Sequence, residues 1–138
     1  MRFEKTKEMK ITVLPEQEKM LSSKKEIRKA CKRKDVISFD IFNENTLVGF
    51  VMLRKFAEHS FFLWDYAIDY KYQNCKYGTI ALKELIEKLE IKYGAKTITT
   101  TYISGNIQAK RLYEKIGFTE TDIVNADTQC EVNMILNL

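Results

Sequence analysis

Cysteine, histidine and proline are scarce in this chain. It has three cysteines, one histidine and one proline among 138 residues. The cysteines are odd in number and widely spaced, and none stands at metal-ligand spacing from the single histidine, so we expect neither a disulfide framework nor a metal site. With so little proline and no low-complexity tract, nothing in the sequence marks a linker, and we predict one domain over residues 1–138.

Long hydrophobic runs are also missing. No apolar stretch approaches the roughly 18 residues that a membrane-spanning helix needs. The first eight residues, Met1–Glu8, lack the apolar core of a signal peptide. We therefore expect no membrane partner and a reduced, cytoplasmic setting.

The net charge is only +4, which suits an anionic ligand without requiring nucleic acid. Basic residues are nevertheless concentrated in one segment, which holds Lys24, Lys25, Arg28, Lys29, Lys32, Arg33 and Lys34. Such a run is usually the solvated face of a helix, and the alternative is a patch for an acidic partner or for nucleic acid. No aromatic residues are interleaved to stack bases, so nucleic acid is not the expected partner.

Hydrophobic periodicity predicts a mixture of strands and helices. Short strands are expected at Lys10–Leu14, Val36–Phe42, Leu47–Leu53, Phe61–Ile68, Thr97–Ile103, Glu120–Val124 and Cys130–Leu136. Helices are expected from Pro15 to about Lys32, with a break near Ser22 and Ser23, from Gly78 to Tyr93, and from Asn106 to Ile116. The segments 36–53 and 120–136 are predicted hairpins, the second turning at Asn125, Ala126 and Asp127.

This order predicts an α/β (mixed α+β) fold, with a central sheet flanked by helices. The strand, helix and strand between Phe61 and Ile103 form a right-handed unit whose two strands are parallel. In such sheets ligands bind where neighbouring strands diverge at their carboxyl ends, so the site is expected after Ile68. The turn there leads to Gly78 and a helix N-terminus, whose free N–H groups and dipole suit a phosphate.

Two segments carry a resemblance to a known family. Ala67–Thr79 looks like a pyrophosphate loop of the form Q/R-x-x-G-x-G/A, and Asn106–Phe118 is similar to the segment N-x-x-A-x-x-L-Y-x-x-x-G-F. Together with the predicted strand order, they resemble the GNAT superfamily of acetyl-CoA-dependent N-acetyltransferases over about residues 36–138. The run Ile68–Gln73 is most similar to small bacterial polyamine and diamine acetyltransferases.

The resemblance implies a central sheet that is predominantly antiparallel with one parallel βαβ core, and acetyl-CoA as co-substrate. It implies direct attack of a primary amine on the thioester, with Tyr113 protonating the leaving thiolate. The residues that would bind acetyl-CoA are Ala67, Ile68, Gln73, Asn74, Cys75, Lys76, Tyr77, Gly78, Thr79, Asn106, Tyr113 and Lys115.

The sequence departs from the family pattern at two positions. Lys76 replaces the middle glycine of the loop, where it could add a cation or tighten the backbone. Trp64 stands where relatives often carry a glutamate base, which leaves Asp65 as the nearest candidate base. In a regular strand Asp65 points to the opposite face from Trp64, and a β-bulge would redirect it. The alternative role of Asp65 is an edge carboxylate in an ion pair.

The sequence is compatible with three alternative functions. The first is acetylation of a small-molecule primary amine, such as a polyamine. The second is acetylation of a protein N-terminus or lysine, and the third is a non-catalytic acyl-CoA-binding module. The C-terminal hairpin could also close a homodimer.

Overall fold

The computed structural model describes residues 1–125 and 129–138, so Ala126 and Asp127 of the predicted hairpin turn lie outside the described residues. The strands form one seven-stranded sheet in the order β1-β2-β3-β4-β5-β7-β6. Their bounds are β1 Arg2–Lys5, β2 Val36–Asn43, β3 Thr46–Ala57, β4 Ser60–Ile68, β5 Thr97–Ile103, β6 Thr119–Asn125 and β7 Cys130–Asn137. Every neighbouring pair is antiparallel except β4 and β5, which confirms the predicted fold class.

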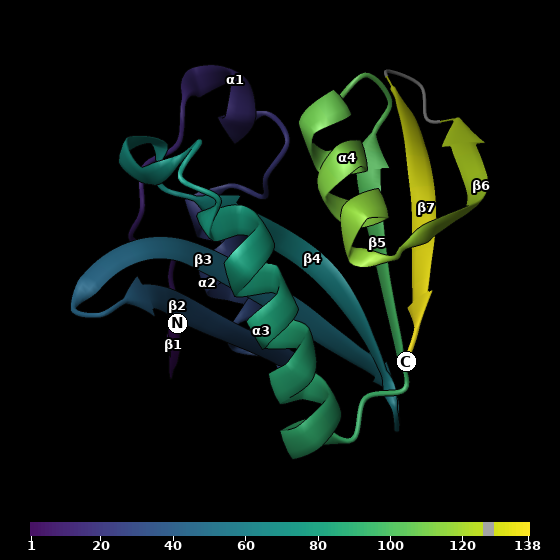
Figure 1. Ribbon diagram of the computed structural model, residues 1–138, viewed down its shortest axis with the longest axis horizontal. Coiled ribbons are helices and arrows are strands. Elements are labelled where there is room, and N and C mark those ends of the chain that lie inside the picture. Colours follow the sequence, from purple (N-terminus) through teal and green to yellow (C-terminus); the bar gives the residue numbers. More distant parts are fainter. Residues whose placement is uncertain (126–128) are drawn as a thin grey trace.

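Helices cover both faces of this sheet (Figure 1). Their bounds are α1 Pro15–Glu18, α2 Lys24–Ala30, the short 3₁₀ helix η1 Tyr70–Tyr72, α3 Tyr77–Tyr93 and α4 Ile107–Ile116. In Figure 1, α3 and α4 lie in front of the strands and α2 lies behind them. The predicted N-terminal helix is thus two helices, because the chain breaks before Ser23, which caps α2 by accepting a hydrogen bond from the Glu26 N–H.

The prediction of a strand at Lys10–Leu14 is wrong, and the strand at Arg2–Lys5 was missed. Met9, Ile11 and Val13 are buried in a core cluster shared with Ile27 of α2. Their alternation has a real cause, because one side of this extended segment packs against apolar residues. The segment does not pair within the sheet, however, and β1 takes the edge position beside β2.

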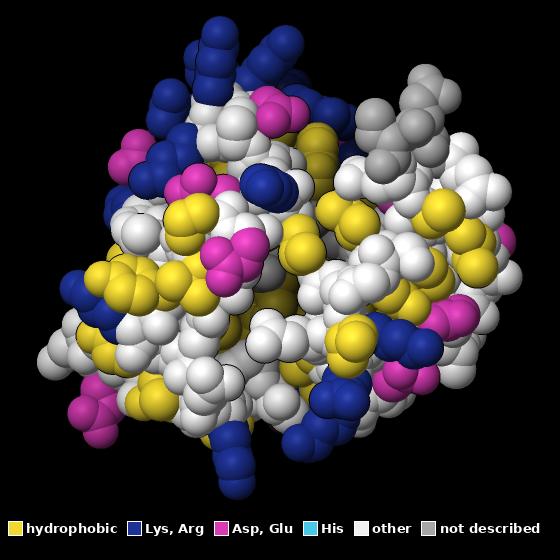
Figure 2. All heavy atoms as spheres, turned by 90° about the horizontal axis from the view of Figure 1, so that it is seen from above, with side chains coloured by type: hydrophobic (Ala, Val, Ile, Leu, Met, Phe, Trp, Pro, Cys, Tyr) yellow, Lys and Arg dark blue, Asp and Glu magenta, His cyan; other side chains and the backbone are white. Residues whose placement is uncertain are grey.

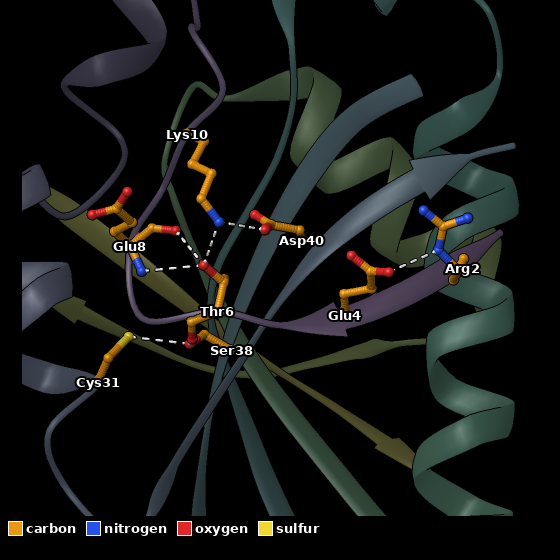
Figure 3. A network of polar contacts seen from close by, with 8 residues as sticks. All are labelled: Arg2, Glu4, Thr6, Glu8, Lys10, Cys31, Ser38 and Asp40. Carbon is orange, nitrogen blue, oxygen red and sulfur yellow. Dashed lines mark hydrogen bonds and ion pairs between the residues drawn. The ribbon is translucent and has the colours of Figure 1, made fainter. Parts of the chain in front are cut away.

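Polar contacts fasten the chain between β1 and α1 to the sheet (Figure 3). The Lys10 ammonium lies 2.7 Å from a carboxylate oxygen of Asp40, which is buried in β2. The Ser38 hydroxyl, also on β2, donates to the Thr6 carbonyl oxygen and lies 3.1 Å from the Cys31 sulfur. These contacts fix where the following α1 begins, at the same end of the molecule as the carboxyl end of β4 (Figure 1).

The parallel strands β4 and β5 pair only at their beginnings. Their register runs from Ser60 opposite Thr97 to Leu63 opposite Thr100, and beyond it the two strands separate (Figure 1). Close approach of β3 to the end of β4 requires glycine, because a Cβ on Gly49 would lie 2.9 Å from the Ala67 carbonyl oxygen. The separation leaves a gap in the sheet at the carboxyl end of β4.

Among the described residues, no helix has the length and apolarity that a membrane crossing needs.

Candidate active site

A cavity of about 1010 Å³ lies where β4 and β5 separate. Figure 2 shows the molecule from this end, hollowed at its centre with apolar side chains at the floor. One side of the cavity, here called the loop side, is formed by residues 68–79 and α4. The other, here called the acceptor side, is formed by residues 13–21 with Trp64 and Asp65 of β4.

The loop side begins with a turn that leaves backbone N–H groups exposed to the cavity. Asn74 and Lys76 both adopt left-handed backbone conformations, with φ of 63° and 66°. The first intrahelical hydrogen bond of α3 joins the Ile80 N–H to the Lys76 carbonyl oxygen. The N–H groups of residues 77–79 therefore precede the helical ladder, and within residues 1–125 and 129–138 none of them donates to a protein acceptor. Free N–H groups at the positive end of the α3 dipole suit an anion such as a phosphate.

Lys76 thus occupies a backbone conformation that favours glycine. It is the residue that precedes α3, and its side chain is exposed at the edge of the cavity. Lys76 adopts this conformation although a left-handed non-glycine residue costs about 1–2 kcal/mol. Lys76 and Lys115, both on the loop side, add positive charge at the cavity edge.

Three side chains that the sequence did not single out hold this loop in place. The Tyr66 hydroxyl donates to the Gly78 carbonyl oxygen at 2.6 Å, and the Asn43 amide donates to the Tyr77 hydroxyl at 3.0 Å. Gln17 of α1 exchanges amide hydrogen bonds with Gln73, at 3.0 and 2.8 Å. None of these contacts follows from local spacing, because each joins segments that meet only in the folded chain.

Gln73, predicted to bind the cofactor, makes protein contacts instead of leaving its amide free. Besides the pair with Gln17, its amide nitrogen donates to the Ile68 carbonyl oxygen at 3.0 Å. The backbone nearby is joined to the N-terminal segment as well, since the Tyr70 N–H donates to the Thr12 carbonyl oxygen at 2.9 Å. The loop side and the acceptor side are therefore tied together.

Asn106 is the N-cap of α4. Its side-chain oxygen accepts from the Ala109 N–H at 3.2 Å, and its amide lies 3.0 Å from the Met20 sulfur. Gly117 ends the helix at φ 120°, in the left-handed region that glycine adopts freely. The two caps explain why the sequence segment 106–118 begins with asparagine and ends with glycine. They also fix the rotation of α4 about its own axis.

That rotation turns Tyr113 inward. The ring packs against Phe118 with centroids 5.5 Å apart, and the residue is only 7% exposed while still lining the cavity. Burial raises the pKa of Tyr113, and the negative charge of Asp65 raises it further, while a hydrogen bond with Thr100 opposes both. The phenol is accordingly held protonated, as a proton donor must be.

Asp65 reaches the cavity because β4 is bulged. Met52 of β3 lies opposite Asp65 while the next residue, Leu53, lies opposite Leu63, so Trp64 is the extra residue. The bulge places Asp65 on the same sheet face as Trp64, as the sequence suggested a bulge would. The Asp65 carboxyl makes no ion pair among the described residues, which removes the alternative reading of an edge ion pair.

The surroundings of the Asp65 carboxyl favour its protonated form. The residue is 4% exposed, one oxygen accepts from the Ser22 N–H at 3.0 Å, and the other has no partner in the described residues. Burial raises the pKa of Asp65, and the hydrogen bond from Ser22 opposes this only in part. A carboxylate with a raised pKa in a cavity is a candidate proton acceptor.

The structure brings nearly all the predicted site residues to one cavity. Its lining includes Asp65, Ala67, Ile68, Gln73, Asn74, Lys76, Tyr77, Gly78, Thr79, Asn106, Tyr113 and Lys115. Cys75 is the exception, because its side chain is exposed and turned back toward the Gln73 carbonyl oxygen, 3.6 Å away. On the acceptor side the sequence singled out Trp64 and Asp65, whereas the individual lining residues of 13–21 carry no motif that identifies them.

Three curated relatives match part of the chain, and two of them differ in the acceptor that their names give. A [ribosomal protein bS18]-alanine N-acetyltransferase from Haemophilus influenzae is 33% identical over 87 residues, which are 63% of this chain and 58% of that protein. A spermine/spermidine N(1)-acetyltransferase from Bacillus subtilis is 35% identical over 85 residues, 56% of each protein. The chain thus spans a little over half the length of the curated relatives it matches.

Many solved structures share the fold, and two of them illustrate the likeness. An acetyltransferase of the GNAT family from Elizabethkingia anophelis, with acetyl-CoA bound, superposes with a TM-score of 0.77 at 18% identity, covering 99% of this chain and 97% of the other. A dodecameric spermidine N-acetyltransferase from Vibrio cholerae has a TM-score of 0.69 at 18% identity, covering 83% and 74%. Residues 5–118 match the Acetyltransferase (GNAT) family. The predicted resemblance is therefore confirmed, and the chain belongs to the GNAT acetyltransferase family.

Proposed function

We propose that this protein transfers an acetyl group from acetyl-CoA to the primary amine of a small molecule. The observation that carries the proposal is that Asp65 and Tyr113 line the same cavity, close enough for the charge of Asp65 to raise the pKa of Tyr113. The loop that suits an anion lines this cavity too. The loop residues fit coenzyme A, because three N–H groups and two lysines meet a pyrophosphate with complementary charge. Acetyl-CoA would supply a thioester, whose carbonyl carbon the amine attacks and from which the thiolate leaves.

The chain's own residues would handle the protons. Tyr113 would donate its hydroxyl proton to the departing sulfur, since its raised pKa keeps the phenol protonated. Asp65 would accept a proton from the amine, directly or through water, because its raised pKa makes it a stronger base than an exposed aspartate. The apolar residues around them, Met20, Leu21 and Trp64, would limit the access of bulk water to the reacting atoms.

The identity of the amine separates the remaining alternatives. The relatives named above act on a ribosomal protein in one case and on spermine or spermidine in the other, so their names support both kinds of acceptor. A small molecule is favoured here because the acceptor side lies within a cavity, under α1 and beside buried Asp65. The predicted homodimer stays a prediction; exposed Ile123 and Val124 on the edge strand β6 are consistent with it.

The test is release of free thiol from acetyl-CoA in the presence of amines, amino acids, polyamines and peptides. We expect turnover with at least one small primary amine. Thermal stabilisation by acetyl-CoA without thiol release for any acceptor would favour the non-catalytic binding module. Turnover restricted to peptides would favour the protein acceptor.

A further inference from the structure

A second groove adjoins the acceptor side of the cavity. It encloses about 420 Å³ and is lined by Arg54, Phe56, Phe62, Trp64, Thr99, Thr101 and Asn133. Trp64 and Thr101 line both the groove and the main cavity, so the two spaces meet at these residues. The groove therefore continues the space beside Asp65 rather than forming a separate site.

Strand register explains why these residues face the same way. Arg54, Phe62 and Thr99 are consecutive partners across β3, β4 and β5, and Thr101 pairs with Asn133 across β5 and β7. Residues paired across a ladder point to the same side of a sheet. The bulge at Trp64 turns Asp65 to this side as well, so the candidate base and the groove share one sheet face.

Arg54 is the charged residue of the groove lining. Its Nε is buried and has no hydrogen-bond partner in the described part of the chain. Asp35, at the end of the turn before β2, is close enough for the charge of Arg54 to help lower its pKa, but its two carboxylate oxygens accept from Arg33, at 2.6 Å and 3.0 Å. On the far side of the groove, Asp122 accepts from the Asn133 amide at 3.2 Å. The Nε is closed to solvent, but Arg54 as a whole is only half-buried and lines the groove, so its guanidinium is available to an incoming anion.

Further basic groups lie near Arg54, whereas the acids Asp35 and Asp122 are already bonded to Arg33 and Asn133. The Arg33 guanidinium lies 5.9 Å from the Trp64 ring, and the basic run from Lys24 to Lys34 belongs to α2 and the turn after it, on the same sheet face. A second ammonium group on an acceptor would be repelled here, whereas a carboxylate would be attracted. Phe56, Phe62 and Trp64 offer apolar walls for the carbon chain between the two ends of such an acceptor.

We infer that the acceptor is a small amino carboxylate, whose amine lies at Asp65 and whose carboxylate is bound by Arg54. The inference rests on the proposed acetyl transfer and names its substrate class. Along the ladder Asp65 lies opposite Met52, two residues from Arg54, so the positions of Arg54 and Asp65 are roughly 7 Å apart at about 3.3 Å per residue, before the lengths of the side chains are added.

The experiment compares amines of equal chain length that differ only at the far end. ω-Amino carboxylic acids about four to eight carbons long are assayed beside the matching alkylamines and α,ω-diamines, by thiol release from acetyl-CoA. We expect the highest kcat/KM for an amino carboxylate and the lowest for the diamine of that length. Arg54→Gln should lower kcat/KM for the amino carboxylate about tenfold or more, mainly through KM, and leave the alkylamine within about twofold.

Two variants keep the result interpretable. Lys92→Gln removes one positive charge from the exposed last turn of α3, on the opposite face of the sheet, and should change none of the three series. Arg54→Lys should restore part of the loss, because it retains a cation. A wild-type preference for diamines, or an equal effect of Arg54→Gln on all three series, would overturn the inference while leaving acetyl transfer intact.

If no amine is acetylated, the proposed function is wrong. The inference about Arg54 is then tested by measuring the binding of an amino carboxylate. The wild-type protein and Arg54→Gln are then titrated calorimetrically with 6-aminohexanoate in the presence of coenzyme A. Binding that depends on Arg54 supports the inference. Binding that is absent, or equal in the two proteins, overturns it.

Discussion

The two sides of the cavity differ in how they are built. The loop side uses backbone groups, namely the N–H groups in the first turn of α3, the left-handed turn at Asn74 and Lys76, and the caps of α4. The acceptor side uses side chains from separate parts of the chain, including Met20, Leu21 and Trp64. A ligand bound by backbone constrains the local sequence, because only certain residues adopt the necessary φ values and caps. A ligand bound by side chains leaves little trace in local spacing.

The largest effect is expected for substitution of Tyr113, which lies between the loop side and the acceptor side of the cavity. Tyr113→Phe should lower kcat about 10²–10⁴-fold, because it removes the proton donor for the leaving thiolate. The affinity for acetyl-CoA, measured by calorimetric titration, should stay within a few-fold, since the ring still packs against Phe118. Tyr93→Phe is the matched control, because that ring packs against Phe61 away from the cavity. Unchanged turnover in Tyr113→Phe would remove this residue from the mechanism.

Asp65→Asn should act on the acceptor side alone. We expect kcat/KM for the amine to fall about 10–100-fold near neutral pH, with acetyl-CoA binding retained. In the wild-type protein, the rate should decline as pH falls through the raised pKa of Asp65 and this limb should vanish in the variant. A wild-type and variant pH profile of the same shape would contradict the assignment of Asp65 as the base.

The same variant should not be less stable. The pKa of Asp65 is higher in the folded chain than in the unfolded chain, so the fold binds its proton more tightly. The free energy of unfolding therefore falls as pH rises from the ordinary value through the raised one, and the loss persists at neutral pH. Asn carries no charge to bury, and its carbonyl can still accept from the Ser22 N–H. We expect Tm at neutral pH to equal or exceed that of the wild type.

The difference between local and long-range contacts also explains which parts of the fold and the site could be predicted from the sequence. The βαβ core and the positions of Gly78, Asn106 and Gly117 were predictable, because caps and periodicity are local properties of the chain. The prediction of a strand at Lys10–Leu14 was wrong, because its alternating burial arises from packing on α2 rather than from pairing in the sheet. The contacts of Gln17 with Gln73 and of Tyr66 with Gly78 join elements that only folding brings together, so no local pattern predicts them.

Gly78→Val should weaken the loop side while leaving the fold intact. A Cβ at this position would lie 3.8 Å from Cγ1 of Ile68, an ordinary contact, so folding tolerates the substitution. Valine branches beside the free N–H groups, and we expect the Kd for acetyl-CoA to rise about tenfold or more, which corresponds to about 1.4 kcal/mol. Gly78→Ala is the control with a smaller expected effect. Undiminished thermal stabilisation of the valine variant by acetyl-CoA would contradict the anion-binding reading of this loop.

Gln17→Leu tests whether the two sides act together. The substitution removes the amide pair with Gln73, and a net hydrogen-bond loss of about 0.5–1.5 kcal/mol predicts a change of roughly two- to tenfold in affinity. Because α1 and the loop are tied by this pair, KM for the amine and Kd for acetyl-CoA should both rise. Glu18→Ala, on the same short helix, is the control. A rise in only one of the two constants would separate the two sides.

Lys76 should give the smallest effect, because two consequences of the lysine oppose each other. Its left-handed backbone costs about 1–2 kcal/mol, while glycine at the same place loses more chain entropy on folding, so Lys76→Gly should raise stability by no more than about 1 kcal/mol. Lys76→Gln keeps the strained backbone and removes only the charge. If the ammonium attracts phosphate, acetyl-CoA affinity should fall a few-fold in both variants, and more at low salt than at high salt. A loss confined to Lys76→Gly would instead mean that the lysine holds the shape of the loop.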